Sequence, residues 1–70
     1  MNMDEKYPNI AEWVFGGARI EIGNDDNTPV LARAIDEGGV AWEGAAHYET
    51  LDAIFEALEA GIAAWNEENQ

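Results

Sequence analysis

The chain has 70 residues and no cysteine, which predicts one small domain, residues 1–70, without disulfide bonds or thiolate metal ligands. Fifteen acidic residues against three basic ones give a formal net charge of −12 and argue against direct binding to nucleic-acid phosphates or to anionic membranes. A basic protein partner fits this charge, because opposite charges accelerate association, but the same charge would also serve solubility alone.

The first residues carry no targeting signal that the sequence reveals. Residues 1–6 lack the basic and apolar regions of a signal peptide and predict a flexible tail. No apolar stretch approaches the roughly 20 residues needed to span a bilayer. We therefore expect a cytoplasmic protein that does not bind membranes.

A short helix is predicted to begin at Pro8, because proline is favoured in the first helical turn, and to end at Gly16-Gly17. Its apolar side would consist of Ile10, Trp13 and Val14. A strand over residues 13–15 is the alternative, since three consecutive bulky side chains also suit a sheet.

The first strand is predicted over residues 18–22, where polar and apolar side chains alternate and place Ile20 and Ile22 inward. Residues 23–29 form a polar loop with the composition of turns. Its segment Asn24-Asp25-Asp26-Asn27-Thr28 is similar to the start of a calcium loop but lacks the glycine at the sixth position and the glutamate at the twelfth. We expect a turn there and no metal site.

The second and third strands, residues 30–36 and 40–43, form a predicted hairpin with a two-residue loop at Glu37-Gly38 or Gly38-Gly39. Either loop assigns the side chains to the same two faces. One face would carry Leu31, Arg33, Ile35, Val40 and Trp42. The other would carry Val30, Ala32, Ala34, Ala41 and Glu43. The face with the larger apolar side chains is expected to pack on the C-terminal helix.

The C-terminal helix is predicted to run from its N-cap, Thr50, to about Glu67. Apolar residues recur at spacings of three and four and define its buried face: Leu51, Phe55, Leu58, Ile62 and Trp65, with Ile54 beside them. A charged flank consists of Asp52, Glu56 and Glu59. A seam of small side chains consists of Ala53, Ala57, Ala60 and Ala64. This seam would be either a solvated surface or a close-packing surface for the first helix, a second copy or a partner helix.

Together these elements predict an α+β fold in the order α-β-β-β-α: a short N-terminal helix, a three-stranded antiparallel sheet and a long C-terminal helix packed on the sheet. A domain of this size buries only about 60% of its chain surface, so its core is small. Two of the three tryptophans, Trp13, Trp42 and Trp65, are expected in this core. One that stays partly exposed would mark a contact surface.

Side chains suited to catalysis are scarce. The chain has no serine or cysteine, and its single histidine, His47, lies in a loop where an exposed structural role is expected. Thr50 is already explained as a helix cap. Acid–base catalysis by two carboxylates needs a cleft that raises the pKa of one of them, which so small a domain rarely builds. We therefore expect a non-enzymatic protein without catalytic residues, cofactor or metal.

One resemblance covers most of the chain, from about Tyr7 to Trp65. The segments Ile20-Glu21-Ile22-Gly23, Arg33-Ala34-Ile35-Asp36-Glu37-Gly38-Gly39 and Trp42-Glu43-Gly44 resemble those of a group of short uncharacterised bacterial proteins, many of them cyanobacterial. This resemblance implies no function.

A second resemblance is architectural and covers residues 20–64. Three short strands followed by Thr50-Leu51-Asp52-Ala53 and a helix rich in Ala, Glu and Leu are similar to the N-terminal domain of HicB-type antitoxins. The resemblance implies an acidic, partial double-stranded-RNA-binding fold that occludes a small basic ribonuclease. The 70 residues contain neither the Pro-Gly-Cys-like turn nor the DNA-binding segment of that family, so no autoregulatory role is implied.

The sequence thus predicts a non-enzymatic acidic module that binds a basic, nucleic-acid-handling protein and masks its surface, as antitoxins and phage anti-CRISPR or anti-restriction inhibitors do. The carboxylates expected to contact this partner are Asp52, Glu56, Glu59, Asp25 and Asp26. The alternative is a small homodimeric structural protein, held by a sheet edge or by the alanine seam, Ala53, Ala57, Ala60 and Ala64.

Overall fold

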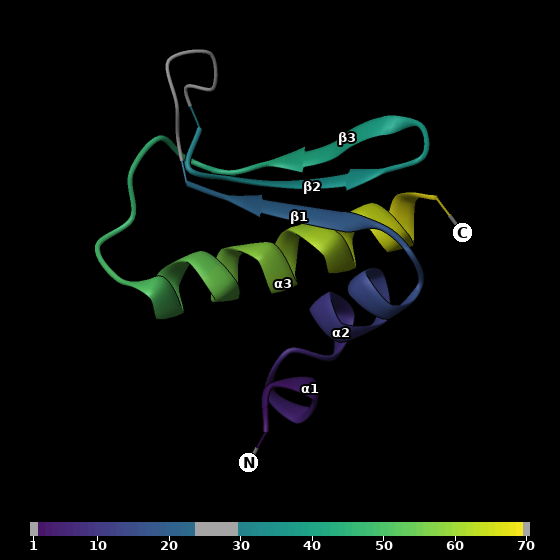
Figure 1. Ribbon diagram of the computed structural model, residues 1–70, viewed down its shortest axis with the longest axis horizontal. Helices are drawn as coiled ribbons and strands as arrows, with labels where there is room; N and C mark the ends of the chain where they lie inside the picture. Colours follow the sequence, from purple (N-terminus) through teal and green to yellow (C-terminus); the bar gives the residue numbers. More distant parts are fainter. Residues whose placement is uncertain (1, 24–29, 70) are drawn as a thin grey trace.

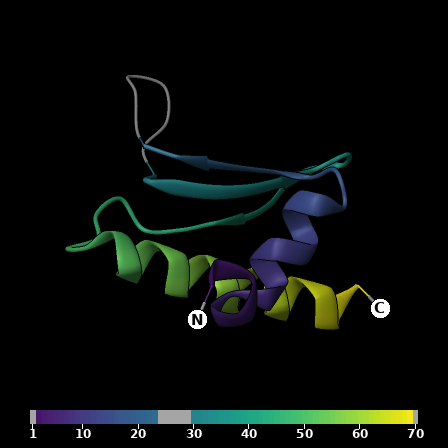
Figure 2. The same ribbon diagram turned by 60° about the horizontal axis from the view of Figure 1, so that its bottom comes forward.

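The computed structural model describes residues 2–23 and 30–69, and these form two layers. In chain order the elements are α1 (Met3–Lys6), α2 (Pro8–Phe15), β1 (Arg19–Ile22), β2 (Ala32–Asp36), β3 (Gly39–Glu43) and α3 (Leu51–Glu68). Within the described residues the strands form one antiparallel sheet in the order β1-β2-β3. Helices α2 and α3 lie on the same side of this sheet (Figures 1 and 2). The predicted α+β fold is confirmed.

Helix α2 forms as its sequence predicts, and the alternative strand over residues 13–15 is wrong. Pro8 occupies the first turn, and the helix gives way to Gly16-Gly17. The second glycine has a φ of 98°, a conformation that other residues rarely adopt, and it turns the chain toward β1. Trp13 faces the core, whereas Val14, predicted on the same side, is 47% exposed.

The tail predicted over residues 1–6 contains a single helical turn, α1, which the sequence analysis did not foresee. The side chain of Asn2 accepts a hydrogen bond from the backbone N–H of Glu5 at 2.9 Å and caps this turn. All residues of α1 are exposed, and the chain becomes buried only at Tyr7, whose ring lies 5.7 Å from that of Phe55.

The β2–β3 hairpin has the two-residue loop that the sequence predicts, at Glu37-Gly38. Asp36 pairs with Gly39 across this loop, and its side chain accepts a hydrogen bond from the backbone N–H of Gly38 at 2.8 Å. Gly39 has a φ of 117°, which favours glycine at this point. The loop therefore explains the second glycine of the Gly-Gly pair, Gly39.

A β-bulge follows this turn and reverses the expected assignment of side chains to the two faces. Ile35 pairs with Val40, but the next residue of β2, Ala34, pairs with Trp42, so β3 holds Ala41 as an extra residue. The sequence argument assumed an unbroken two-residue repeat, and one extra residue shifts every later side chain to the other face. Trp42 faces α3 as predicted, but it does so beside Ala34 rather than Arg33.

The helix-facing side of β2 consequently carries small residues, and the prediction that Arg33 and Ile35 face α3 was wrong. Ala32 and Ala34 are buried in the central cluster with Ile54, Leu58 and Ile62 of α3. Short side chains on the central strand let the helix approach closely while the larger side chains of α3 fill the space between the layers. Arg33 points to the other side of the sheet, opposite Glu21 in β1 and Glu43 in β3.

Helix α3 begins as predicted and turns a slightly different face to the sheet. The hydroxyl of Thr50 caps the helix by accepting a hydrogen bond from the N–H of Ala53 at 3.0 Å. Its buried residues are Ile54, Leu58, Gly61 and Ile62. Leu51, predicted on this face, is 59% exposed, and Ile22, predicted inward on β1, is 43% exposed. The helix turns Gly61 inward because the Trp42 ring lies against it.

Candidate functional site

The few basic residues of the chain neutralise only a small part of its negative charge. Arg33 forms an ion pair with Glu21, the one such pair within residues 2–23 and 30–69. The Lys6 ammonium lies 5.3 Å from the centre of the Tyr7 ring. Its pKa is raised, chiefly by its interaction with the Tyr7 hydroxyl and further by the negative charge of Asp52. Most carboxylates of the described chain therefore have no basic partner of their own.

Glu59 differs from the rest of the predicted acidic flank because both of its carboxylate oxygens hold the start of α2. One oxygen accepts hydrogen bonds from the backbone N–H and the side-chain amide of Asn9, at 2.9 and 2.5 Å. The other accepts from the N–H of Ile10 at 3.0 Å. A carboxylate is favourable at a helix N-terminus, where the N–H groups lack partners within the helix. Glu59 thus joins α3 to α2.

The remaining predicted partner-binding carboxylates fall into two groups. Asp52 and Glu56 are exposed on α3, with Lys6 as the base close enough for both to raise its pKa. Asp25 and Asp26 lie outside the described residues. Of the three carboxylates on the flank of α3, Asp52 and Glu56 can therefore contact a partner without breaking a bond within the fold, whereas Glu59 cannot.

The alanine seam lies at the surface of α3. Ala60 and Ala64 are exposed, whereas Ala53 and Ala57 are half-buried. Helix α2 contacts α3 through Glu59 and Trp65, and Ala60 of the seam lines a pocket together with Asn9 of α2. The role of the seam as a dimer surface stays a prediction.

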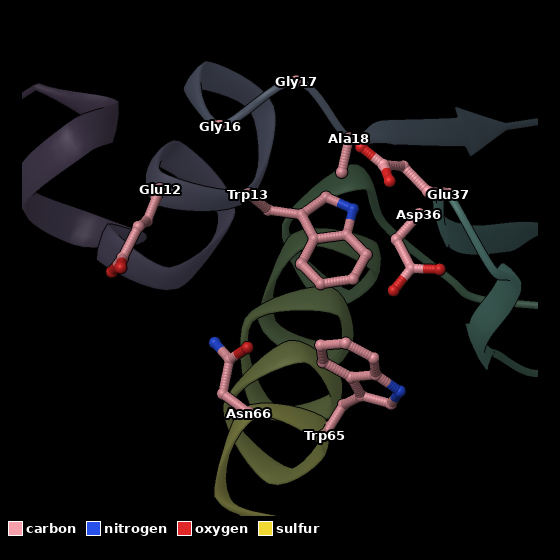
Figure 3. A pocket seen from close by; sticks show the side chains of 9 residues that line it. All are labelled: Glu12, Trp13, Gly16, Gly17, Ala18, Asp36, Glu37, Trp65 and Asn66. Carbon is pink, nitrogen blue, oxygen red and sulfur yellow. The ribbon is translucent and has the colours of Figure 1, made fainter. Parts of the chain in front are cut away.

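A pocket of about 360 Å³ lies where the end of α2, the β2–β3 turn and the last turns of α3 meet (Figure 3). It is lined by two tryptophans, three acidic residues and four small or amide residues: Trp13, Trp65, Glu12, Asp36, Glu37, Gly16, Gly17, Ala18 and Asn66. None of these lining residues is basic, in the part of the chain that the structure describes. The pocket therefore combines aromatic walls with negative charge.

The aromatic walls are held in fixed positions by contacts within the fold. The indole N–H of Trp13 donates a hydrogen bond to the backbone oxygen of Arg19 at 2.9 Å. The rings of Trp13 and Trp65 meet edge to face, with 5.2 Å between their centres and an angle of 87°. Trp13 is 8% exposed, whereas Trp42 and Trp65 are both half-buried, so one tryptophan is buried rather than the two expected. Trp65 is thus one of two partly exposed tryptophans, and it is the one that lines this pocket.

The polar rim of the pocket comes from residues far apart in the sequence. Glu12 lies in α2, whereas Asp36 and Glu37 lie at the β2–β3 turn (Figure 3). The two glycines after α2 add backbone but no side chain to the wall. Sequence reasoning missed this grouping, and its one signal was the presence of a tryptophan in each of the two helices that meet here.

The molecule also exposes an apolar patch on its N-terminal helices. Met3, Val14 and Phe15 are exposed, Phe15 by 80%, and they border a shallow pocket of about 160 Å³. Across residues 2–23 and 30–69, no three His, Asp or Glu side chains gather closely enough to hold a metal ion. Among the same residues, no helix has the length and apolar character needed to cross a membrane.

No protein-family model, curated protein or solved structure matches this chain. The resemblances to short cyanobacterial proteins and to HicB-type antitoxins therefore stay predictions.

Proposed function

We propose that this protein is a non-enzymatic acidic module that binds a basic, nucleic-acid-handling protein and masks the surface with which that protein contacts nucleic acid. The observation that carries the proposal is the small internal compensation of charge. A net charge of −12 is accompanied by one ion pair, Arg33–Glu21, within the described residues. Repulsion among the remaining carboxylates is relieved when a basic surface docks against them.

The exposed carboxylates of α3 supply the surface for this contact. Asp52 and Glu56 point away from the buried face of the helix, so a partner can approach them without disturbing the core. Asp25 and Asp26 remain the second acidic patch that the sequence predicts. Glu59 has a structural role at the start of α2 and adds only its long-range field to binding.

The chemistry of nucleic-acid-binding proteins favours this class of partner. Such proteins present clusters of Lys and Arg that neutralise phosphates, and an acidic protein of similar charge density competes for the same clusters. This is the mode of action of antitoxins and of phage-encoded anti-CRISPR or anti-restriction inhibitors that mimic nucleic acid. The architectural resemblance to the HicB N-terminal domain agrees with it.

Capture and kinetics test the proposal. The full chain, carrying an affinity tag, is used to isolate its partner from cells that encode it, and the partner is identified by mass spectrometry. We expect a basic nucleic-acid-binding protein whose association rate with the chain falls steeply as ionic strength rises. Its nucleic-acid binding should be lost in the complex.

A charge reversal then locates the contact. Asp52→Lys with Glu56→Lys should weaken binding at least about tenfold, because each change replaces an attraction to the basic surface by a repulsion. The matched control is Glu67→Lys with Glu68→Lys, which changes the net charge equally at the far end of α3, where positive charge suits the helix dipole. If both variants bind as tightly as the wild type at low salt, the acidic surface serves solubility and the masking function is wrong.

A further inference from the structure

We propose that the pocket lined by Trp13, Trp65 and the β2–β3 turn receives the guanidinium group of an arginine side chain presented by the basic partner, an inference that rests on the proposed function. The pocket measures about 360 Å³, which is within the range of small-ligand sites, roughly 300–1,000 Å³. It opens near the C-terminal end of α3, whereas Asp52 and Glu56 lie near its start. The two sites can therefore be tested separately.

The two indole rings provide the surface on which a cation is held. Tryptophan is the strongest aromatic partner for cations, because the face of its ring carries negative charge. The Trp13 ring is fixed by its hydrogen bond to the Arg19 backbone and by the edge-to-face contact with Trp65. A guanidinium that enters the pocket meets walls that are already in place, so little ordering cost opposes binding.

The three carboxylates of the rim supply the hydrogen-bond acceptors. Glu12 and Glu37 are exposed, and Asp36 is half-buried with one oxygen accepting from the N–H of Gly38. Asp36 and Glu37 lie together on one side of Trp13, whereas the side chain of Glu12 extends on the other side, away from the two rings (Figure 3). Since none of the described lining residues is basic, no side chain of the pocket itself neutralises them.

Arginine fits this combination better than lysine does. Its planar guanidinium stacks on aromatic faces and donates paired hydrogen bonds to carboxylates at the same time. Lysine offers a compact, strongly hydrated charge that can satisfy the carboxylates but gains less from the rings. Anionic groups are repelled by the three acids. The occupant is therefore a guanidinium on a side chain long enough to reach the pocket beside the Trp13–Trp65 pair.

Titration of the full chain with small analogues tests this inference. N-acetyl-arginine amide is added to ¹⁵N-labelled protein at constant ionic strength, and the indole N–H signals of Trp13, Trp42 and Trp65 are followed by NMR. The neutral isostere N-acetyl-citrulline amide and the lysine analogue are titrated in parallel. We expect saturable shifts at Trp13 and Trp65 with a dissociation constant on the order of 10 mM.

The same titration contains its own control in Trp42, which packs against Gly61 away from the pocket and should not shift. Citrulline should give no saturable shift, and lysine should bind more weakly than arginine. The inference is overturned if citrulline shifts the signals as arginine does, if lysine binds as tightly as arginine, or if Trp42 responds as strongly as Trp65.

Variants of the rim give a second, independent measurement. Asp36→Asn with Glu37→Gln removes two charges, and the side-chain amide introduced by the first change keeps an oxygen that can accept from the N–H of Gly38. This variant should weaken arginine binding about tenfold. The matched control, Glu49→Gln with Glu68→Gln, removes two charges from exposed positions outside the pocket and should bind arginine as the wild type does. Equal binding by both variants contradicts the inference.

The two proposals fail in different ways. Arginine binding in the pocket without capture of any basic protein would contradict the masking function and leave the chemistry of the pocket intact. Salt-dependent capture of a basic partner that is unaffected by Asp36→Asn with Glu37→Gln, together with no saturable arginine shift, would contradict the pocket and leave the masking function intact.

Discussion

Trp42 of β3 packs against Gly61 of α3 so closely that a Cβ atom at position 61 would overlap the indole ring. This contact joins the third strand of the sheet to the long helix. It also explains a glycine in the interior of a helix, where glycine costs about 1 kcal/mol relative to alanine. The cost is offset by the burial of a large aromatic ring against the helix backbone.

The contact predicts that Gly61→Ala destabilises the protein, although alanine is the better helix former. Overpacking of this kind costs about 1–3 kcal/mol, which exceeds the gain in helix propensity. Urea denaturation measures the free energy of unfolding. In the background Trp42→Leu the same change should cost less, because the ring that it displaces is absent. A more stable Gly61→Ala protein would show that Trp42 does not lie against Gly61.

Glu59→Gln should lower the free energy of unfolding by about 1–2 kcal/mol, because the N-terminal N–H groups of α2 lose a charged acceptor. The matched control is Glu56→Gln, one turn earlier on the exposed side of α3, which should change stability by less than about 0.5 kcal/mol. Amide hydrogen exchange at Ile10 should accelerate in the first variant only. Equal effects of the two changes would contradict the structural role of Glu59.

Deletion of Ala41 should leave the protein folded, because it removes the extra residue of the β-bulge and still leaves Val40 opposite Ile35 and Trp42 opposite Ala34, on the side of the sheet that faces α3. Deletion of Ala46, an exposed residue in the connection to α3, is the control and should be tolerated. Circular dichroism and the dispersion of amide signals report the outcome. An unfolded Ala41 deletion beside a folded Ala46 deletion would mean that the β-bulge itself is needed to hold Trp42 against α3.

Added salt should raise the melting temperature, since screening weakens repulsion within a chain of net charge −12. The comparison runs from about 0.02 M to about 0.3 M sodium chloride, which shortens the screening length severalfold. The partly exposed Arg33–Glu21 pair is weakened by the same salt but contributes little. A variant with Glu67→Gln and Glu68→Gln should show a smaller rise. A falling melting temperature would mean that attractive pairs dominate.

The alternative homodimer makes a separate prediction at the alanine seam. If the seam joins two copies, light scattering should find a dimer at micromolar concentration, and Ala60→Glu should convert it to a monomer. Ala60 is exposed in the single chain, so the change should leave the fold intact. A wild-type protein that is monomeric at high concentration rules out this alternative.

Local patterns in the sequence predicted helices α2 and α3, the strands and the hairpin loop, because each depends on neighbouring residues, but they did not predict α1. Pro8, the glycines after Phe15 and the cap at Thr50 act within one turn of their own position. The bulge at Ala41 was missed because a period-two argument has no means to detect one extra residue. Most of the strand-face assignment failed for this single reason.

The candidate site was less predictable because it depends on contacts between the ends of the chain. Glu59 looks like an ordinary surface carboxylate of α3 until α2 is placed beside it, about 50 residues away in the sequence. The pocket likewise gathers Glu12, Asp36 and Trp65 from separate elements. The sequence did single out the tryptophans as contact markers, and Trp65 fits that description.

The bonds from Glu59 to the start of α2 also order the events of folding. During synthesis α2 leaves the ribosome long before α3 exists. An isolated helix of eight residues, such as α2, is not stable in water. Its contacts with α3, Asn9 to Glu59 and Trp13 to Trp65, span about 50 residues. The N-terminal segment must therefore wait, unfolded, until the last residues of α3 are made, and loops of that length close slowly. Every truncation from the C-terminal end that removes both Trp65 and Glu59 should leave the nascent chain without a docked α2.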